Sequence, residues 1–205
     1  MEYKIIDEKN TYIDEDIVIG SGSIIHPFVF LKGKTVLGKN VEVKPFTTIE
    51  NSHIADNTVI ESSHIEDSII GENNKIGPMT HLRPKSNIAN NCKIGNFVEI
   101  KNSNIGNGTK ISHLTYVGDA DLGENINIGC GVVFVNYDGA NKYRSTVKNN
   151  AFIGCNVNIV SPVTIEEDSY IAAGSTVTID TEKGDLLIAR ERERIIKDWK
   201  KPTKE

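Results

Sequence analysis

An aliphatic residue that returns at every sixth position is the feature that most restricts how this chain can fold. The first run of such positions is Ile13, Ile19, Ile25, Leu31, Leu37, Val43 and Ile49. After small shifts, the spacing resumes at Ile70 and again from Val147 to Val177. An amphipathic helix would instead return its apolar residues every three or four positions. The chain is therefore predicted to be a repeat protein built from hexads.

Many of the repeated aliphatic residues are followed by glycine, as in Ile76-Gly77 and Ile153-Gly154. Glycine lets the backbone turn without strain at Cβ, and Asn or Asp at similar places also favours turns. Each hexad is thus predicted to be a short strand and a corner, and three hexads to make one triangular coil. Stacked coils bury the apolar face that one coil alone would expose. The predicted fold class is an all-β parallel β-helix.

Two segments interrupt the hexads. Residues 136–146 (NYDGANKYRST) are predicted to form an inserted loop, and such loops often carry function. After Asp180 the repeat is lost and the sequence becomes highly charged. The chain is therefore divided into a β-helix domain over residues 1–180 and a charged carboxyl-terminal arm over residues 181–205.

Composition excludes several classes of protein. A formal net charge of -5 disfavours nucleic acid as a partner, because a phosphate backbone requires a concentrated basic surface. No apolar run approaches the roughly 20 residues that cross a bilayer, and no signal peptide is evident. The three cysteines lack C-x-x-C spacing, and the five histidines are scattered. We expect a cytoplasmic protein that binds neither nucleic acid nor membrane and has no metal site.

A set of longer motifs carries a family resemblance. The motifs span residues 81–84 (HLRP), 95–101 (GNFVEIK), 113–120 (HLTYVGDA), 125–129 (NINIG), 136–142 (NYDGANK), 171–174 (IAAG) and 188–190 (IAR). In this order they resemble the acetyltransferase domain of the bacterial bifunctional UDP-N-acetylglucosamine pyrophosphorylase/glucosamine-1-phosphate N-acetyltransferase. Residues 1–75 share mainly the repeat.

The resemblance implies a left-handed β-helix, a homotrimer, and acetylation of glucosamine 1-phosphate with acetyl-CoA as cosubstrate. Handedness comes from the resemblance alone, since parallel crossovers are usually right-handed. The hexads begin almost at Met1, so the nucleotidyltransferase domain of the fused relatives is not expected here. Whether a separate nucleotidyltransferase is a partner in the pathway to UDP-N-acetylglucosamine stays open on sequence grounds.

The resemblance also assigns roles to individual residues. His113 matches the family's catalytic histidine, which suits a general base because imidazole titrates near neutral pH. Glu99 matches the carboxylate that orients this histidine. The sugar-binding positions are matched by Arg83, Lys101, Tyr116, Asn127, Asn136 and Lys142, of which the three cations suit a phosphate.

For acetyl-CoA, the matching positions are Cys130, Asn136, Tyr137, Cys155, Ala173 and Arg190, and Trp199 is expected to cover the cofactor from the arm. The family usually has alanine and serine at the two positions that are cysteine here. Thiols are small enough to pack at such places. A cysteine nucleophile is not expected, since no Cys-His-carboxylate pattern is present.

Three alternatives stay open on sequence grounds. One is a related acyltransferase that acts on another amino sugar or nucleotide sugar, because one scaffold can host many substrates. Another is a metal-dependent carbonic anhydrase, which would need clustered histidines, and adjacent coils could align two of the five. The third is a non-catalytic paralogue, against which the intact motif residues argue.

Overall fold

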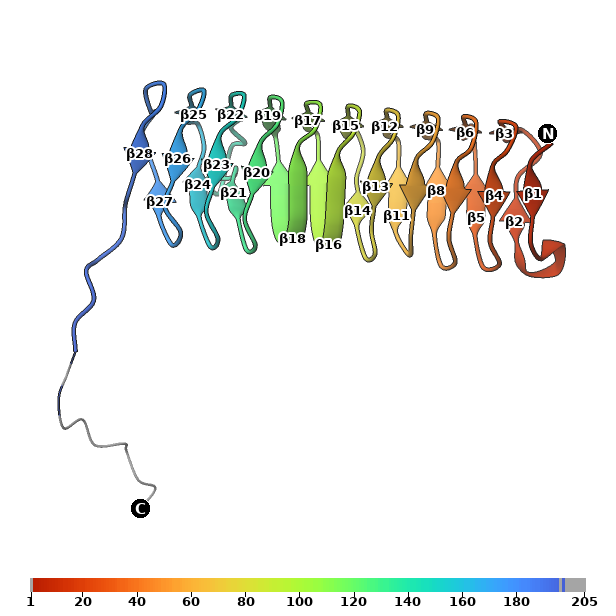
Figure 1. Ribbon diagram of the computed structural model, residues 1–205, viewed down its shortest axis with the longest axis horizontal. Coiled ribbons are helices and arrows are strands. Elements are labelled where there is room, and N and C mark those ends of the chain that lie inside the picture. Colours follow the sequence, from red (N-terminus) through yellow and green to blue (C-terminus); the bar gives the residue numbers. More distant parts are fainter. Residues whose placement is uncertain (1, 196, 198–205) are drawn as a thin grey trace, which may run out of the picture.

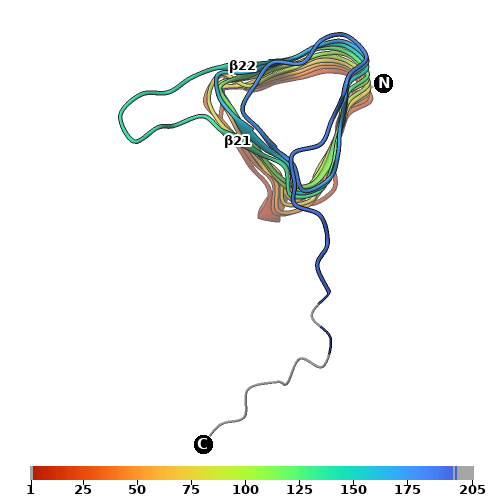
Figure 2. The same ribbon diagram turned by 90° about the vertical axis from the view of Figure 1, so that its left-hand side faces the viewer.

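The structure is a computed structural model that describes residues 2–195 and 197. Short parallel strands stack into a three-sided prism whose coils follow one another along a single axis (Figure 1). Seen along that axis, the coils superimpose as a triangle with one projecting loop and a trailing carboxyl-terminal segment (Figure 2). The prism is a left-handed parallel β-helix of hexapeptide repeats, as predicted.

The three sides of the prism are called face one, face two and face three in chain order. Face one is formed by β1 (Lys4–Ile5), β4 (Ile24–Ile25), β7 (Glu42–Val43), β10 (Val59–Ile60), β13 (Lys75–Ile76), the first part of β16 (Lys93–Lys101), the first part of β18 (Lys110–Gly118), β20 (Asn127–Ile128), β23 (Phe152–Ile153), β26 (Tyr170–Ile171) and β28 (Leu186–Leu187). A short 3₁₀ helix, η1 (Glu8–Asn10), lies in the first coil.

Face two carries the polar residues of interest. It is formed by β2 (Tyr12–Ile13), β5 (Phe30–Lys32), β8 (Thr48–Glu50), β11 (His64–Glu66), β14 (His81–Leu82), the ends of β16 and β18, β21 (Val133–Val135), β24 (Asn158–Val160) and β27 (Thr176–Val177). Because β16 and β18 continue around the corner, faces one and two join into one sheet.

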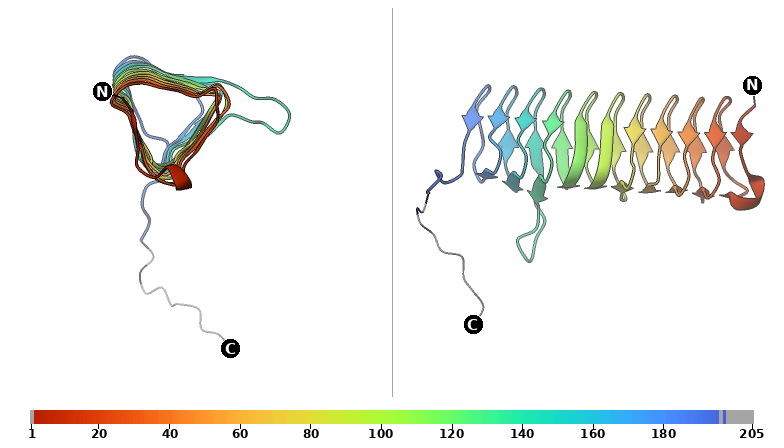
Figure 3. Two further views of the ribbon diagram at one scale, coloured as in Figure 1. Left: turned by 90° about the vertical axis from the view of Figure 1, so that its right-hand side faces the viewer. Right: turned by 60° about the horizontal axis from the view of Figure 1, so that its bottom comes forward.

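Face three is a separate sheet. It is formed by β3 (Val18–Ile19), β6 (Val36–Leu37), β9 (His53–Ile54), β12 (Ile69–Ile70), β15 (Asn87–Ile88), β17 (Asn104–Ile105), β19 (Ala120–Leu122), β22 (Ser145–Val147) and β25 (Thr164–Ile165). The end-on and tilted views show all three sides and the loop that leaves the prism before face three (Figure 3).

The repeated aliphatic residues fill the inside of the prism. Ile25 pairs in register with Val43, and Val43 pairs with Ile60, so equivalent side chains stack from coil to coil. These side chains are fully buried. The coil from Ile25 to Val43 has the length of three full hexads, and the coil from Val43 to Ile60 is one residue shorter. Such differences in coil length account for the shifts in the sequence period. Burial of apolar area, at about 25 cal/mol per Å², is the main stabilising contribution.

Two boundaries differ from the sequence prediction. The loop ends at Arg144, because Ser145 and Thr146 already pair with β19 as part of β22. The prism continues beyond Asp180, where β28 pairs with β26 and closes one more coil. In the part of the chain that the structure describes, no helix is long and apolar enough to cross a membrane.

Candidate functional site

Three cations gather where face two meets the inserted loop. Arg83 follows β14, Lys101 ends β16 on the next coil, and Lys142 comes from the loop. The Lys142 ammonium lies close enough to lower the pKa of Lys101, with partial burial and the Arg83 charge adding to the effect. Bringing like charges together is unfavourable unless an anion neutralises them. One chain thus brings the three cations together, and the cluster has the chemistry of an anion site.

Glu99 contacts Arg83. Its Oε1 accepts a hydrogen bond of 2.8 Å from Nη1 of Arg83, and this carboxylate raises the pKa of Arg83 above its usual value. In the ladder between β16 and β18, Glu99 faces Tyr116, whereas His113 faces Asn96. The expected Glu99–His113 contact is therefore not made: within residues 2–195 no hydrogen bond joins the two side chains. Glu99 instead holds the guanidinium that borders the cluster.

Asn136 is fixed at the base of the loop. Its Nδ2 donates to Oδ2 of Asp119 at 2.6 Å and more weakly to Oη of Tyr116 at 3.4 Å. Asn136 and Asp119 are both nearly buried. Gly118 allows this arrangement, because a Cβ there would collide with Tyr116 and with the Asn136 amide. Asp119 had no role predicted from the sequence, although it lies within the motif that contains His113 and Tyr116.

His113 lies at the corner between faces one and two, and its side chain is exposed. Backbone hydrogen bonds stack this corner on the next three: Gly131 N donates to Leu114 O, Asn156 N to Cys130 O, and Gly174 N to Cys155 O. The resulting corner column is His113, Cys130, Cys155 and Ala173. With strands about 4.8 Å apart, its three steps extend about 14 Å. Small side chains thus form a strip that leads away from His113.

Arg190 lies at the far end of the corner column. Ala189 N donates to Oγ of Ser175 at 3.1 Å, which holds the chain after β28 against this corner. A Cβ placed on Gly174 would lie 3.8 Å from Cδ of Arg190. The column and Arg190, both predicted to bind acetyl-CoA, are therefore adjacent. Trp199, the other predicted contact on the arm, lies outside the described residues.

The loop has its own fixing contacts. Asp138 accepts hydrogen bonds from Asn141 N and Ala140 N, which lower its pKa and close a tight turn. Tyr137 pairs with Lys142 across this turn, which directs Lys142 back toward the prism. At the end of the loop, Arg144 forms an ion pair with Asp121.

Sequence comparisons identify the relatives of this chain. A family model described as "GMPPB C-terminal domain" matches residues 6–86, and one described as "Bacterial transferase hexapeptide (six repeats)" matches residues 144–178. Bifunctional protein GlmU of Clostridioides difficile strain 630 is 55% identical over 195 residues. That match covers 95% of this chain and 42% of the relative. Over 95% of its length, this chain is therefore a relative of the carboxyl-terminal part of GlmU proteins.

The matched part of GlmU proteins is their carboxyl-terminal repeat region. GlmU of Caldicellulosiruptor saccharolyticus is 53% identical over 196 residues, covering 96% of this chain and again 42% of that protein. The chain spans less than half the length of these curated GlmU relatives.

Solved structures share the same prism. The UDP-N-acetylglucosamine acyltransferase of Francisella novicida aligns with a TM-score of 0.58 at 21% identity, over 85% of this chain and 62% of that one. The enzyme of the same name from Campylobacter jejuni gives 0.57 at 18% identity, over 89% and 70%. At such low identity these likenesses establish the fold of this GlmU relative and nothing finer.

Two predicted residues lie away from the cation cluster. Asn127 is in β20 on face one, opposite Lys110 and Phe152, whereas the cluster is on face two. Tyr137 is on the exposed part of the loop, where its hydroxyl donates to Gly139 O. One chain alone therefore does not bring Asn127 to the predicted sugar site.

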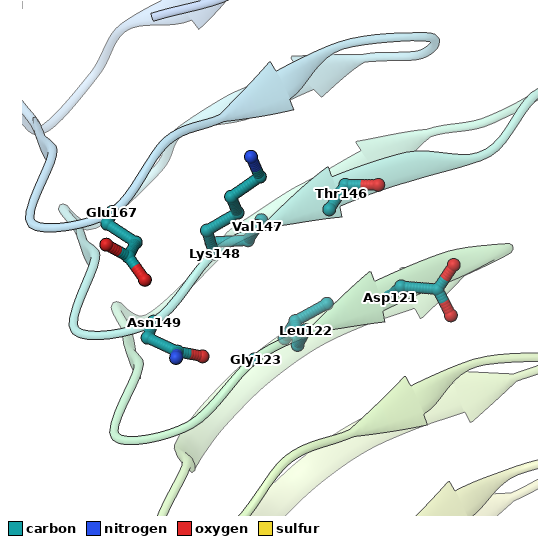
Figure 4. A pocket seen from close by; sticks show the side chains of 8 residues that line it. All are labelled: Asp121, Leu122, Gly123, Thr146, Val147, Lys148, Asn149 and Glu167. Carbon is teal, nitrogen blue, oxygen red and sulfur yellow. The ribbon is translucent and has the colours of Figure 1, made fainter. Parts of the chain in front are cut away.

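A separate hollow of about 270 Å³ lies on face three (Figure 4). Its lining includes Asp121, Thr146, Lys148 and Glu167, and none of the predicted site residues. Lys148 is already paired with Glu166 at 2.6 Å. This hollow therefore lacks the gathered cations and the histidine that mark the region around the loop.

Proposed function

We propose that this chain is an acetyl-CoA-dependent N-acetyltransferase that converts glucosamine 1-phosphate to N-acetylglucosamine 1-phosphate. The observation that carries the proposal is the cation cluster of Arg83, Lys101 and Lys142, which lies on the face that starts at the His113 corner. Similarity to the carboxyl-terminal part of GlmU proteins and the fold shared with solved acyltransferases support an acyltransferase in general. The acceptor and the donor are inferred from the family resemblance, and the chemistry of the matching residues is consistent with both.

The acceptor's phosphate is the natural counterion for the cluster. Arg83 can donate two parallel hydrogen bonds to phosphate oxygens, and the two lysines add point charges. A dianion would also remove the repulsion that lowers the pKa of Lys101. Tyr116 and Asn136, held together at the base of the loop, supply a hydroxyl and an amide for the sugar's polar groups.

His113 is proposed as the general base. Its exposed imidazole can take a proton from the amine as the nitrogen attacks the acyl carbonyl. A new C–N bond forms, the C–S bond of the thioester breaks, and the departing thiolate takes up a proton. No covalent acyl-enzyme is required, so Cys130 and Cys155 act as packing surfaces.

The corner column fits the donor. Its outward side chains after His113 are two thiols and one methyl group, which leave a narrow acyl-CoA arm room to lie along the corner. Gly129 and Gly154 permit this close stacking, because a Cβ on either would meet the backbone of the next coil. Arg190, at the end of the column, is placed to pair with a cofactor phosphate.

The proposed active form is a homotrimer, and an apolar ridge supports it. One corner of the prism carries Phe46, Met79, Phe97 and Leu114, each 58–71% exposed and each at positive φ. Bulky residues seldom adopt this conformation, and strain of this kind persists where it serves a function. Elsewhere most positive-φ residues are asparagine, aspartate or glycine. Side-by-side prisms would cover the ridge, and a neighbour's face one could bring Asn127 to the cation cluster.

An acetyl-transfer assay with a panel of acceptors tests the proposal. Glucosamine 1-phosphate is expected to be acetylated with a kcat/KM well above those of glucosamine and of UDP-linked amino sugars. Preference for a nucleotide sugar would favour a related acyltransferase and overturn the proposed acceptor. Absence of transfer to every acceptor, in a protein that retains the prism by circular dichroism, would favour a non-catalytic paralogue.

A further inference from the structure

Two of the five histidines come together on face two, outside the proposed catalytic residues. His64 in β11 lies directly opposite His81 in β14, on the next coil. Glu66 is two residues after His64 and therefore points to the same side of the strand. The donor atoms of these three residues all lie within 4.8 Å of one another. Residues 17 positions apart in sequence thus form one polar group.

The geometry is close to that of a coordination site. Nε2 of His81 is 3.3 Å from Oε1 of Glu66, and the two imidazole rings are nearly perpendicular, with centroids 5.1 Å apart. A tetrahedral zinc ion with bonds of about 2.0–2.1 Å would separate its ligand atoms by about 3.4 Å. The His81–Glu66 pair already has this spacing. His64 is exposed, and its donor nitrogen lies within 4.8 Å of the donor atoms of the other two residues.

We propose that His64, Glu66 and His81 bind one divalent transition-metal ion of the zinc class. Two imidazoles and a carboxylate suit zinc, nickel or copper, whereas magnesium and calcium prefer oxygen ligands alone. Three protein ligands leave at least one position open to water or to another ligand. No metal site was expected from the sequence because the five histidines are scattered, although adjacent coils were expected to be able to align two of them.

The surrounding charges support a cation at this place. Glu50 lies next to Glu66 in the ladder between β8 and β11, and its carboxylate adds negative charge. Arg83 lies close enough to Glu66 for the two charges to interact. Its guanidinium, however, forms an ion pair with Glu99, with 2.8 Å between Nη1 and Oε1. The triad thus shares no residue with the cation cluster, although the two adjoin each other on face two.

The chain contains a matched control. His26 Nε2 lies 3.0 Å from Oε1 of Glu42, which is the same pair of ligand types. Across residues 2–195 and 197, however, His64, Glu66 and His81 are the one group in which three such ligands meet. A pair has too few ligands to hold zinc tightly, so binding at the triad should depend on His64 and His81 and not on His26.

The test is a titration of the chelator-treated full chain with Zn²⁺, followed by calorimetry, without sugar or acetyl-CoA. We expect one ion per chain, with affinity unaffected by excess Mg²⁺. His64→Ala and His81→Ala should each weaken binding by roughly tenfold or more, since loss even of residues behind the ligands typically costs 10–100-fold. His26→Ala should bind like the wild type.

Two further readouts make the result decisive. Zn²⁺ should raise the melting temperature of the wild type by mass action and leave a His64→Ala, His81→Ala double variant unchanged. Co²⁺ should give the visible absorption of a four-coordinate ion in the wild type only. The proposal is overturned if no ion binds, or if the double variant binds with wild-type stoichiometry and affinity. Acetyl transfer is not measured here, so this outcome is independent of the proposed enzyme activity.

Discussion

Asn136 Nδ2 and Asp119 Oδ2 are joined by a hydrogen bond of 2.6 Å at the base of the inserted loop. Asp119 also accepts a hydrogen bond from Nδ2 of Asn102 on the preceding coil. One nearly buried carboxylate thus links three consecutive coils and sets where the loop leaves the prism. Because the loop carries Lys142, this link also positions the cation cluster.

Replacing Asp119 should therefore disturb both stability and acceptor binding. Asp119→Ala leaves two amide groups without their partner, which should cost about 1–3 kcal/mol. We expect a lower melting temperature and a higher KM for glucosamine 1-phosphate, with a smaller change in KM for acetyl-CoA. The control is Asn87→Ala, which removes an exposed hydrogen bond from the side-chain amide of Asn87 to that of Asn104. Equal effects in the two variants would show that Asp119 has no special positioning role.

His113→Ala should lower kcat by about 100-fold or more and change ligand affinity little, because general bases typically contribute 10²–10⁴-fold. His53→Ala, which removes an exposed histidine on face three, is the matched control and should keep wild-type activity. Steady-state kinetics with both substrates separates the two effects. A His113→Ala variant with more than half the wild-type kcat would mean that another group accepts the proton.

The lowered pKa of Lys101 gives a pH dependence with a definite sign. Lys142 disfavours the charged form of Lys101, so Lys101 loses its proton, and part of its attraction for phosphate, at a lower pH than an isolated lysine would. In Lys142→Ala this repulsion is gone, and the pKa of Lys101 should rise.

Binding of N-acetylglucosamine 1-phosphate, which has no titrating amine, measures this difference. Lys142→Ala should weaken binding near pH 7 by about 1.5–3 kcal/mol, the scale for hydrogen bonds to charged groups. The further loss of affinity with rising pH should begin at a higher pH in the variant than in the wild type. Identical pH profiles would show that Lys142 does not act on Lys101.

A substitution in the apolar ridge should weaken assembly of the trimer without unfolding the single prism. Phe97→Asn places a residue that tolerates positive φ at a strained corner, and removes an exposed aromatic side chain. We expect the variant to dissociate at protein concentrations where the wild type is a trimer by light scattering, while each prism stays folded. Ile69→Asn, on the exposed surface of β12, is the control. A Phe97→Asn trimer as stable as the wild type would place the interface elsewhere.

The carboxyl-terminal arm should affect the donor more than the acceptor. Arg190 lies beside the corner column, so removing residues 190–205 should raise KM for acetyl-CoA several-fold more than KM for the sugar phosphate, with the trimer intact. Unchanged constants in the truncated trimer would leave the arm without a role in catalysis. Arg190→Ala tests whether the arginine alone accounts for the effect.

The sequence by itself determined the fold, because the information is local. The aliphatic residues of the hexads are buried in the inner coils, as Ile25 and Val43 are, and only partly buried in the end coils, as Ile13 is, so a period of six predicts the core directly. The inserted loop was visible for the same reason, as an interruption of that period. Family resemblance singled out Arg83, Lys101 and Lys142, and stacked coils with a projecting loop offered a way to bring them together.

Only the tertiary structure decided which polar side chains meet. Neighbours on a face belong to different coils, and the coils differ in length by a residue or more, so their register cannot be read from a uniform repeat. This register places Glu99 against Arg83 and away from His113, and it brings His64 to His81. It also puts Asp119 beneath Asn136, 17 residues later in the chain. An apolar core tolerates one-residue shifts in register because burial of apolar side chains is not directional. Hydrogen bonds and metal coordination are directional, so each shift changes which polar side chains can form them.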